Sequence, residues 1–182
     1  MDAGFIGDEK VRQRVENALE YILVLYEESK QTSNPKYKTE KYRTIILYVV
    51  SILEAVLFAV YAERENKIKK PEYKWKQKLS NKYICIDDGG NRCDGSTVIA
   101  LKQSTDKAEL EIGFQELTSF LVDEKVLKKE TAERMCAISG LRNTFHFRKL
   151  GSHNCALTDV EEAFELLEYS LKHSRRFLPA TK

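Results

Sequence analysis

One long apolar segment, IILYVVSILEAVLFAVYA at residues 45–62, constrains the fold more than any other feature of the sequence. A run of this length raises the question of a membrane span. Its one charged residue, Glu54, lies near the centre, where a carboxylate is costly in lipid, and the sequence offers no second span. We therefore expect a central helix of a soluble protein, in which Glu54 has a hydrogen-bonding partner, and keep a single-pass anchor as the alternative.

Amphipathic patterns on both sides of this segment predict a mostly α-helical bundle of about five helices. The central helix is expected at about residues 39–66, because the polar segment QTSNPKYK, with Pro35, breaks the preceding pattern. The other helices are expected at about 8–29, after a cap formed by Asp106 and Glu109, at about 130–147, and from a capping box of Thr158 and Glu161 to before Pro179.

Between the second and third helices the pattern changes to strand-like alternation, which predicts a basic β-hairpin inserted at about residues 72–103. Two β-prone runs, at 83–86 and 97–101, are separated by the reversing sequence DDGGNRCDGS. Cys85 and Cys93 could face each other across this hairpin, as two thiols or as a disulfide.

The 182 residues are expected to form one domain, residues 1–182, with the hairpin as an insertion. With 30 basic and 28 acidic side chains the net charge is +2, so affinity for nucleic acid would need a local patch. The start, MDAGFIGDEK, has no leader pattern, and the four cysteines have no zinc-site spacing. These features favour a cytoplasmic protein that has no metal or other cofactor and is not bound to a membrane.

Such a local basic patch lies between residues 64 and 82, where eight basic residues and two acids are interleaved with aromatic residues. This composition suits contacts to phosphates and stacking on bases, and it predicts RNA binding. The alternative is that the lysines keep an exposed edge strand soluble and unpaired. The residues expected to bind RNA are Lys74, Trp75, Lys76, Lys78 and Lys82.

The segment ISGLRNTFHFRKL holds the residues best suited to chemistry, Arg142, Asn143 and His146, within an expected helix. Helical positions four apart project from one face, so Arg142 and His146 could share one ligand, with Ser139 on the same polar stripe. A guanidinium suits phosphate, and a histidine can move protons near neutral pH. The alternative role is structural: Arg142 would pair with an acid such as Glu161 or Glu162, and His146 would cap the helix end.

The sequence R-N-T-F-H at residues 142–146, followed by a loop and the capped acidic helix LTDVEEAFELLEYSLKH, resembles the C-terminal half of HEPN domains. Members of that family carry an arginine, commonly followed by a polar residue such as asparagine, and then a histidine after four to six intervening residues. In this chain three residues intervene. The resemblance covers residues 130–176 by motif, and the earlier chain only by its helical layout.

Many HEPN proteins are metal-independent endoribonucleases of toxin–antitoxin or antiphage defence systems, and they act as dimers with the motif at the dimer groove. The resemblance therefore implies a homodimeric, HEPN-like RNA-binding protein, in which Arg142 binds phosphate, Asn143 assists orientation and His146 is catalytic. It also implies an antitoxin or other protein partner. Because some family members with degenerate motifs do not cut RNA, the alternative is a non-catalytic RNA- or protein-interaction module.

Overall fold

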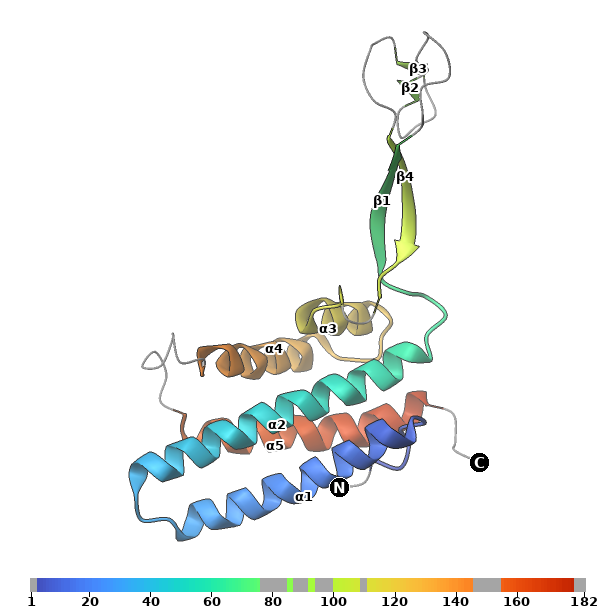
Figure 1. Ribbon diagram of the computed structural model, residues 1–182. Helices are drawn as coiled ribbons and strands as arrows, with labels where there is room; N and C mark the ends of the chain where they lie inside the picture. Colours follow the sequence, from blue (N-terminus) through green and yellow to red (C-terminus); the bar gives the residue numbers. More distant parts are fainter. Residues whose placement is uncertain are drawn as a thin grey trace. The chain divides into compact units, whose positions relative to one another are not determined.

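The computed structural model describes residues 3–75, 85–86, 92–93, 100–108, 111–145 and 155–178. Within these ranges the chain is mostly helical, as the sequence predicts, with five α-helices (Figure 1). These are α1 (Glu9–Gln31), α2 (Pro35–Ala62), α3 (Phe114–Asp123), α4 (Lys129–Thr144) and α5 (Leu157–Ser174), followed by the short 3-10 turn η3 (Arg175–Phe177).

The chain divides into two compact units. The helical unit comprises residues Met1–Glu65 and Gly113–Lys182, and it contains all five α-helices of the described chain. The strand unit is the intervening segment, Asn66–Ile112.

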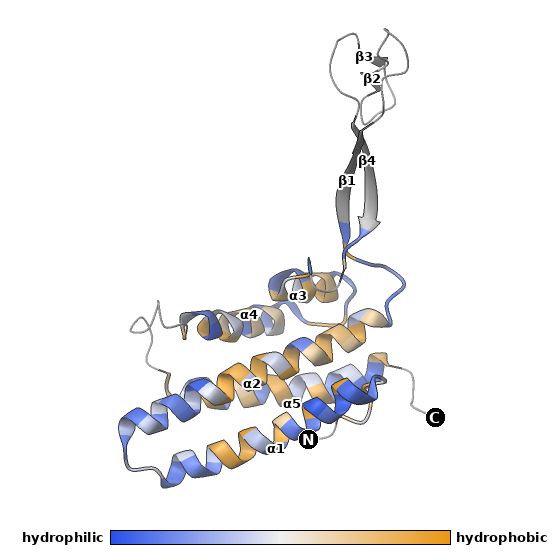
Figure 2. Ribbon diagram, viewed as in Figure 1, coloured by the Kyte–Doolittle hydropathy of each residue, from blue (hydrophilic) through white to orange (hydrophobic). Residues whose placement is uncertain are grey.

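α2 is the central helix of the helical unit, because it contacts α1, α3, α4 and α5. Its apolar residues are therefore buried on more than one side, and Ile45, Ile46, Leu53 and Leu57 are fully buried. Each such side chain contributes about 1.5–3 kcal/mol when it leaves water, so α2 supplies much of the hydrophobic core. The expectation of a central helix contacted on several sides is confirmed, and Figure 2 shows its hydrophobic character along most of its length.

By length and composition α2 could also cross a membrane. Its most apolar window has a mean hydropathy of 2.4, and 56% of that window is buried inside the protein. The core helix of a soluble protein can be equally long and equally apolar, so length and hydropathy leave both alternatives open.

The predicted start of α2 at residue 39 is wrong, because the helix begins at Pro35. Proline suits the first helical turn, where its missing N–H would have no helical acceptor. Asn34 caps the same end, and its Oδ1 accepts a hydrogen bond from the backbone N–H of Lys36 at 3.0 Å. The helix ends at Ala62 rather than at residue 66.

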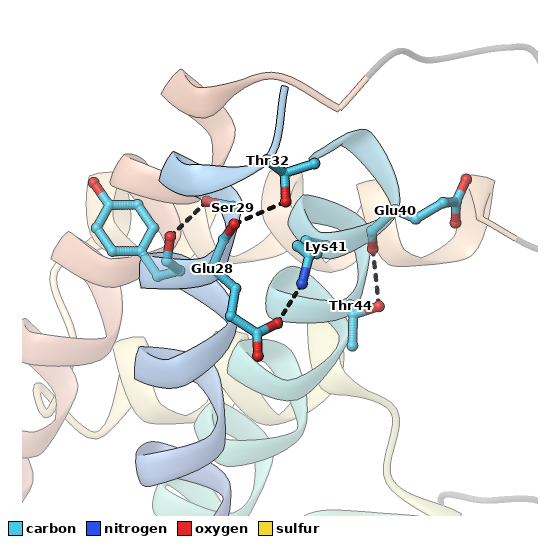
Figure 3. A network of polar contacts seen from close by, with 7 residues as sticks. Glu28, Ser29, Thr32, Glu40, Lys41 and Thr44 are labelled. Atoms are coloured by element: carbon cyan, nitrogen blue, oxygen red, sulfur yellow. Dashed lines mark hydrogen bonds and ion pairs between the residues drawn. The ribbon is translucent and has the colours of Figure 1, made fainter. Parts of the chain in front are cut away.

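Polar side chains hold the corner between α1 and α2 (Figure 3). Lys41 of α2 forms an ion pair with Glu28 of α1. At the end of α1, Ser29 Oγ donates to the carbonyl of Tyr26 at 2.6 Å, and Thr32 Oγ1 donates to the carbonyl of Glu28 at 2.8 Å. These bonds satisfy carbonyl groups at the end of α1. The connection from Gln31 to Pro35 is short, so α1 and α2 lie side by side and antiparallel (Figure 1).

The helix caps predicted at Asp106 and at Thr158 are wrong. Asp106 does not cap α3, because it ends a β-strand and α3 begins only at Phe114. Thr158 does not cap α5, because the helix already begins at Leu157. The cap comes instead from Asp159, whose carboxylate accepts a hydrogen bond from the Ala156 N–H at 2.8 Å.

In the strand unit, β1 (Lys69–Trp75) pairs antiparallel with β4 (Ala100–Asp106). The register places Lys69 opposite Asp106 and Trp75 opposite Ala100, and the side chains of Lys69 and Asp106 form an ion pair. This pairing connects the two ends of the unit.

Two further short strands, β2 (Cys85–Ile86) and β3 (Arg92–Cys93), pair antiparallel with Cys85 opposite Cys93. The sequence predicted longer hairpin strands at 83–86 and 97–101. Residues 76–84, 87–91 and 94–99, which include much of both, lie outside the described residues.

Candidate functional site

The last turn of α4 places Arg142 against the middle of α2. Arg142 Nη1 donates to Glu54 Oε1 at 3.0 Å, and the two side chains are 28% and 30% exposed. The prediction that Glu54 needs a hydrogen-bonding partner is confirmed. The alternative pairing of Arg142 with Glu161 or Glu162 is wrong, because its partner comes from a different helix.

Glu162 is instead bound by another arginine of α4, Arg134. Arg134 Nε lies 3.0 Å from Glu162 Oε1, and its Nη2 lies 2.8 Å from Glu165 Oε2. The hydrogen bonds that Arg134 donates to Glu165 and Glu162 raise the pKa of its guanidinium, and they lower the pKa of the Glu165 carboxyl. This three-residue contact connects α4 to α5 and leaves Arg142 to interact with α2.

The contact with Glu54 fixes the orientation of Arg142 without covering it. A guanidinium carries five N–H donors in one plane, and the described part of the chain supplies Glu54 as the acceptor for Nη1. Because the side chain remains 28% exposed, solvent reaches part of that plane. An arginine held in this way is suited to bind an anion such as phosphate from the solvent side.

A second arginine, Arg43 of α2, reaches the same end of α4. Its guanidinium carbon lies 5.8 Å from the centre of the Phe145 ring, and its Nη1 pairs with Glu40 at 2.6 Å. Phe145 caps α4, and its N–H donates to the Arg142 carbonyl at 3.2 Å. Cations are favourable there because a helix carries a partial negative charge at its C-terminal end.

We call Arg43, Glu54, Arg142 and Phe145 the α4-end cluster. Sequence reasoning did not assign Arg43 to a site. The available signal was its spacing from Glu54, since helical geometry places the two positions within about 20° of each other around the axis. The same side of α2 therefore supplies both contacts to the end of α4.

Cys155 lies close to this cluster, at the start of α5, but it is not suited to nucleophilic chemistry. The pKa of its thiol is raised to about 12, mainly by burial and to a lesser extent by the charge of Asp159, while the charge of Arg43 opposes the shift. The reactive thiolate form is therefore scarce at neutral pH.

The other residues of the predicted motif are placed only in part. Asn143 is exposed in α4, whereas Ser139, expected on the polar stripe, is buried at 6% exposure because it faces the core. The predicted helix to residue 147 is too long, since α4 ends at Thr144. His146 lies outside the described residues, so it stays a prediction that its side chain projects from the same face as Arg142.

The predicted RNA-binding residues belong to the strand unit, whereas Arg142 and Asn143 belong to the helical unit. Lys74 and Trp75 end β1, opposite Leu101 and Ala100 of β4. The remaining three, Lys76, Lys78 and Lys82, lie outside the described residues. Among the residues that the structure places, no group of three or more His, Cys, Asp or Glu side chains is arranged to hold a metal ion.

No family model matches this chain. Comparisons with curated proteins and with solved structures also gave no match. The resemblance to HEPN domains therefore rests on the amino-acid sequence alone, chiefly on residues 130–176.

Proposed function

We propose that this protein is a HEPN-like RNA-binding protein that cuts RNA without a metal ion, as a homodimer, through Arg142, Asn143 and His146. The observation that best supports the proposal is that the Arg142 guanidinium is oriented by Glu54 and stays partly exposed to solvent. In the sequence, His146 follows Arg142 after three residues. We place this activity in a cytoplasmic toxin or antiphage system, with a cognate antitoxin or other protein partner.

The proposed reaction is attack of a ribose 2'-hydroxyl on the adjacent phosphorus. The 2'-oxygen loses its proton and forms a bond to phosphorus, the bond to the 5'-oxygen breaks, and that oxygen gains a proton. Arg142 would stabilise the negative charge that develops on the phosphate oxygens. One imidazole cannot easily serve both proton transfers, so His146 would act as base while His146 of the partner subunit acts as acid.

The test is cleavage of single-stranded RNA by the full chain in the presence of EDTA. We expect 2',3'-cyclic phosphate ends, and we expect His146→Ala to abolish cutting without changing the melting temperature. His153→Ala, a histidine seven positions along the same segment, is the matched control and should keep the activity. Full activity of the His146→Ala variant would remove this residue from the mechanism.

A second candidate function is a non-catalytic RNA- or protein-interaction module. The Arg142–Glu54 ion pair favours it, because the pair gives the arginine a structural role that needs no ligand. RNA binding by the wild-type protein without cleavage products would support this function against the first.

A further inference from the structure

Two cysteines of the strand unit occupy opposite positions on paired strands. β2 pairs antiparallel with β3, and the register makes Cys85 the Cα partner of Cys93 and Ile86 the partner of Arg92. In the sequence, residues 87–91 connect the two strands. Directly opposite residues share one face of an antiparallel ladder, so the register places both cysteines on the same face.

This register meets the backbone condition for a disulfide. The Cα atoms of directly opposite residues lie about 4.5 or about 5.5 Å apart, depending on whether the two residues exchange hydrogen bonds. A disulfide needs Cα atoms about 4.4–6.8 Å apart, so both kinds of pair qualify. A shift of one position would move Cys93 to the other face of the ladder, so the juxtaposition depends on this register.

The other two cysteines of the chain are free thiols of the helical unit. Cys136 lies in α4, where its Sγ is 3.3 Å from Thr118 Oγ1. Cys155 is buried, and its raised pKa of about 12 leaves little of the thiolate that takes part in thiol–disulfide exchange. The helical unit thus supplies two cysteines against which the reactivity of Cys85 and Cys93 can be compared.

β2 and β3 are short for strands that must hold their own pairing. Each has two residues, and within the described residues they form a separate two-stranded sheet. Strands of globular proteins usually have about 3–10 residues, and an isolated two-stranded hairpin is at best marginally stable in water. A covalent bond between Cys85 and Cys93 would close a loop in the unpaired chain and remove part of the entropy that opposes pairing.

We propose that Cys85 and Cys93 form a reversible disulfide that stabilises the β2–β3 pairing of the strand unit. In the cytoplasm, where the proposed function places the protein, disulfides are usually transient and redox-sensing. The inference goes beyond the proposed function and does not depend on RNA cleavage.

The oxidant in this proposal is a small disulfide such as glutathione disulfide. The thiolate of one cysteine attacks a glutathione sulfur, so that a mixed disulfide forms and one glutathione thiolate leaves. The thiolate of the second cysteine then attacks the protein sulfur of the mixed disulfide and releases the second glutathione. The two cysteines lose two electrons and two protons, and glutathione disulfide gains them as two thiols.

The first experiment equilibrates the full chain with mixtures of reduced glutathione and glutathione disulfide. The remaining thiols are alkylated in denaturant, and the chain is digested with trypsin without a reductant. Trypsin cuts after lysine and arginine, so Cys85 lies in the peptide 83–92 and Cys93 in the peptide 93–102. Mass spectrometry should find these two peptides joined, with two hydrogen atoms fewer than the separate peptides, and reduction should separate them.

The comparison with the helical unit and with the unfolded chain shows whether the fold brings the two thiols together. We expect Cys136 and Cys155 to be alkylated under the conditions that join Cys85 to Cys93. Folding raises the effective concentration of one thiol at the other, so the native chain should be half oxidised at about a tenfold lower level of glutathione disulfide than the chain in urea.

The second experiment measures how fast trypsin cuts the native chain after Arg92, which requires the strands to open. The disulfide lowers the population of the open form, so the oxidised wild type should be cut about tenfold more slowly than the reduced wild type. Cys85→Ser should be cut at one rate in both redox states. Cys136→Ser is the matched control and should keep the wild-type difference.

Absence of the joined peptides from the native chain would overturn the proposal, and so would half oxidation at the same glutathione ratio in urea. Equal oxidation of Cys136 or Cys155 would show general thiol oxidation and would overturn it as well. A disulfide that leaves the cutting rate after Arg92 unchanged would overturn the stabilising role. None of these measurements uses RNA, so a failure here leaves the proposed function intact.

Discussion

At the scale of single residues, the contact between Glu54 and Arg142 explains how a carboxylate is tolerated in the middle of the most apolar helix. The two groups are each about 30% exposed, so the pair keeps some hydration and avoids the full desolvation cost of a buried ion pair. Its contribution to stability should exceed that of a surface pair, because water screens it less.

A double-mutant cycle measures that contribution. We expect Glu54→Gln to lower the free energy of unfolding by about 1 kcal/mol, and we expect a coupling of similar size between Glu54→Gln and Arg142→Gln. Urea unfolding of the wild type, both single variants and the double variant provides the measurement.

The control cycle uses Glu9 and Arg12 in the first turns of α1, whose side chains are 87% and 33% exposed. The distance from Arg12 Nη2 to Glu9 Oε1 is 3.8 Å. Their coupling should be close to zero. Equal couplings in the two cycles would mean that the Glu54–Arg142 pair contributes no more than a surface contact.

At the scale of helices, Arg134 connects α4 to α5 through Glu162 and Glu165, and this connection should depend on pH. The hydrogen bond from Arg134 lowers the pKa of Glu165 in the folded chain. A carboxyl with a lowered folded pKa stabilises the fold above its unfolded pKa, about 4.3, and this stabilisation is lost as the pH falls through the folded value.

We therefore expect Arg134→Gln to destabilise the protein at pH 7, and we expect the difference from wild type to shrink as the pH falls below about 4. Thermal unfolding followed by circular dichroism across this pH range provides the measurement. Arg14→Gln, at an exposed position of α1, is the control and should show no such convergence. A difference that stays constant with pH would remove Glu165 from the connection.

Periodicity was sufficient to predict which segments are helical, because each helix buries one stripe of apolar residues. It did not predict the ends, since these depend on local caps: Asn34 allows α2 to begin at Pro35, and the Asp159 carboxylate reaches back to Ala156. The need for a partner at Glu54 followed from the cost of an unpaired charge. Its identity did not follow, because Arg142 is 88 positions away in the chain and only the packing of α4 on α2 brings the two together.

At the scale of the whole molecule, the predicted RNA contacts are divided between two units. Arg142 belongs to the helical unit, and Lys74 and Trp75 belong to the strand unit. If both units contact the same RNA, cleavage and affinity should respond to different substitutions, since base stacking and phosphate contacts along the strand unit would set affinity.

The triple variant Lys74→Gln, Lys76→Gln and Lys78→Gln tests this division. Each phosphate contact to single-stranded nucleic acid contributes about 0.7 to the slope of log affinity against log salt concentration, so the slope should fall by about 2. Fluorescence anisotropy of labelled RNA between low and moderate salt provides the measurement.

The matched control changes three exposed lysines of the helical unit, Lys10, Lys128 and Lys129, to glutamine. The control should keep the wild-type slope. If both triple variants change the slope equally, the binding is non-specific attraction to positive charge.

Because the strand unit is inserted between α2 and α3 in the sequence, its length and its residues can change with little effect on the helical unit. α5 packs on α2, so folding the helical unit closes a loop that contains all of Asn66–Ile112. The entropy of closing a flexible loop grows only with the logarithm of its length, at about 0.6 kcal/mol for each doubling. The segment can therefore be lengthened, shortened or exchanged for another at little cost to the helices, which makes it the natural place for such a chain to acquire a new specificity.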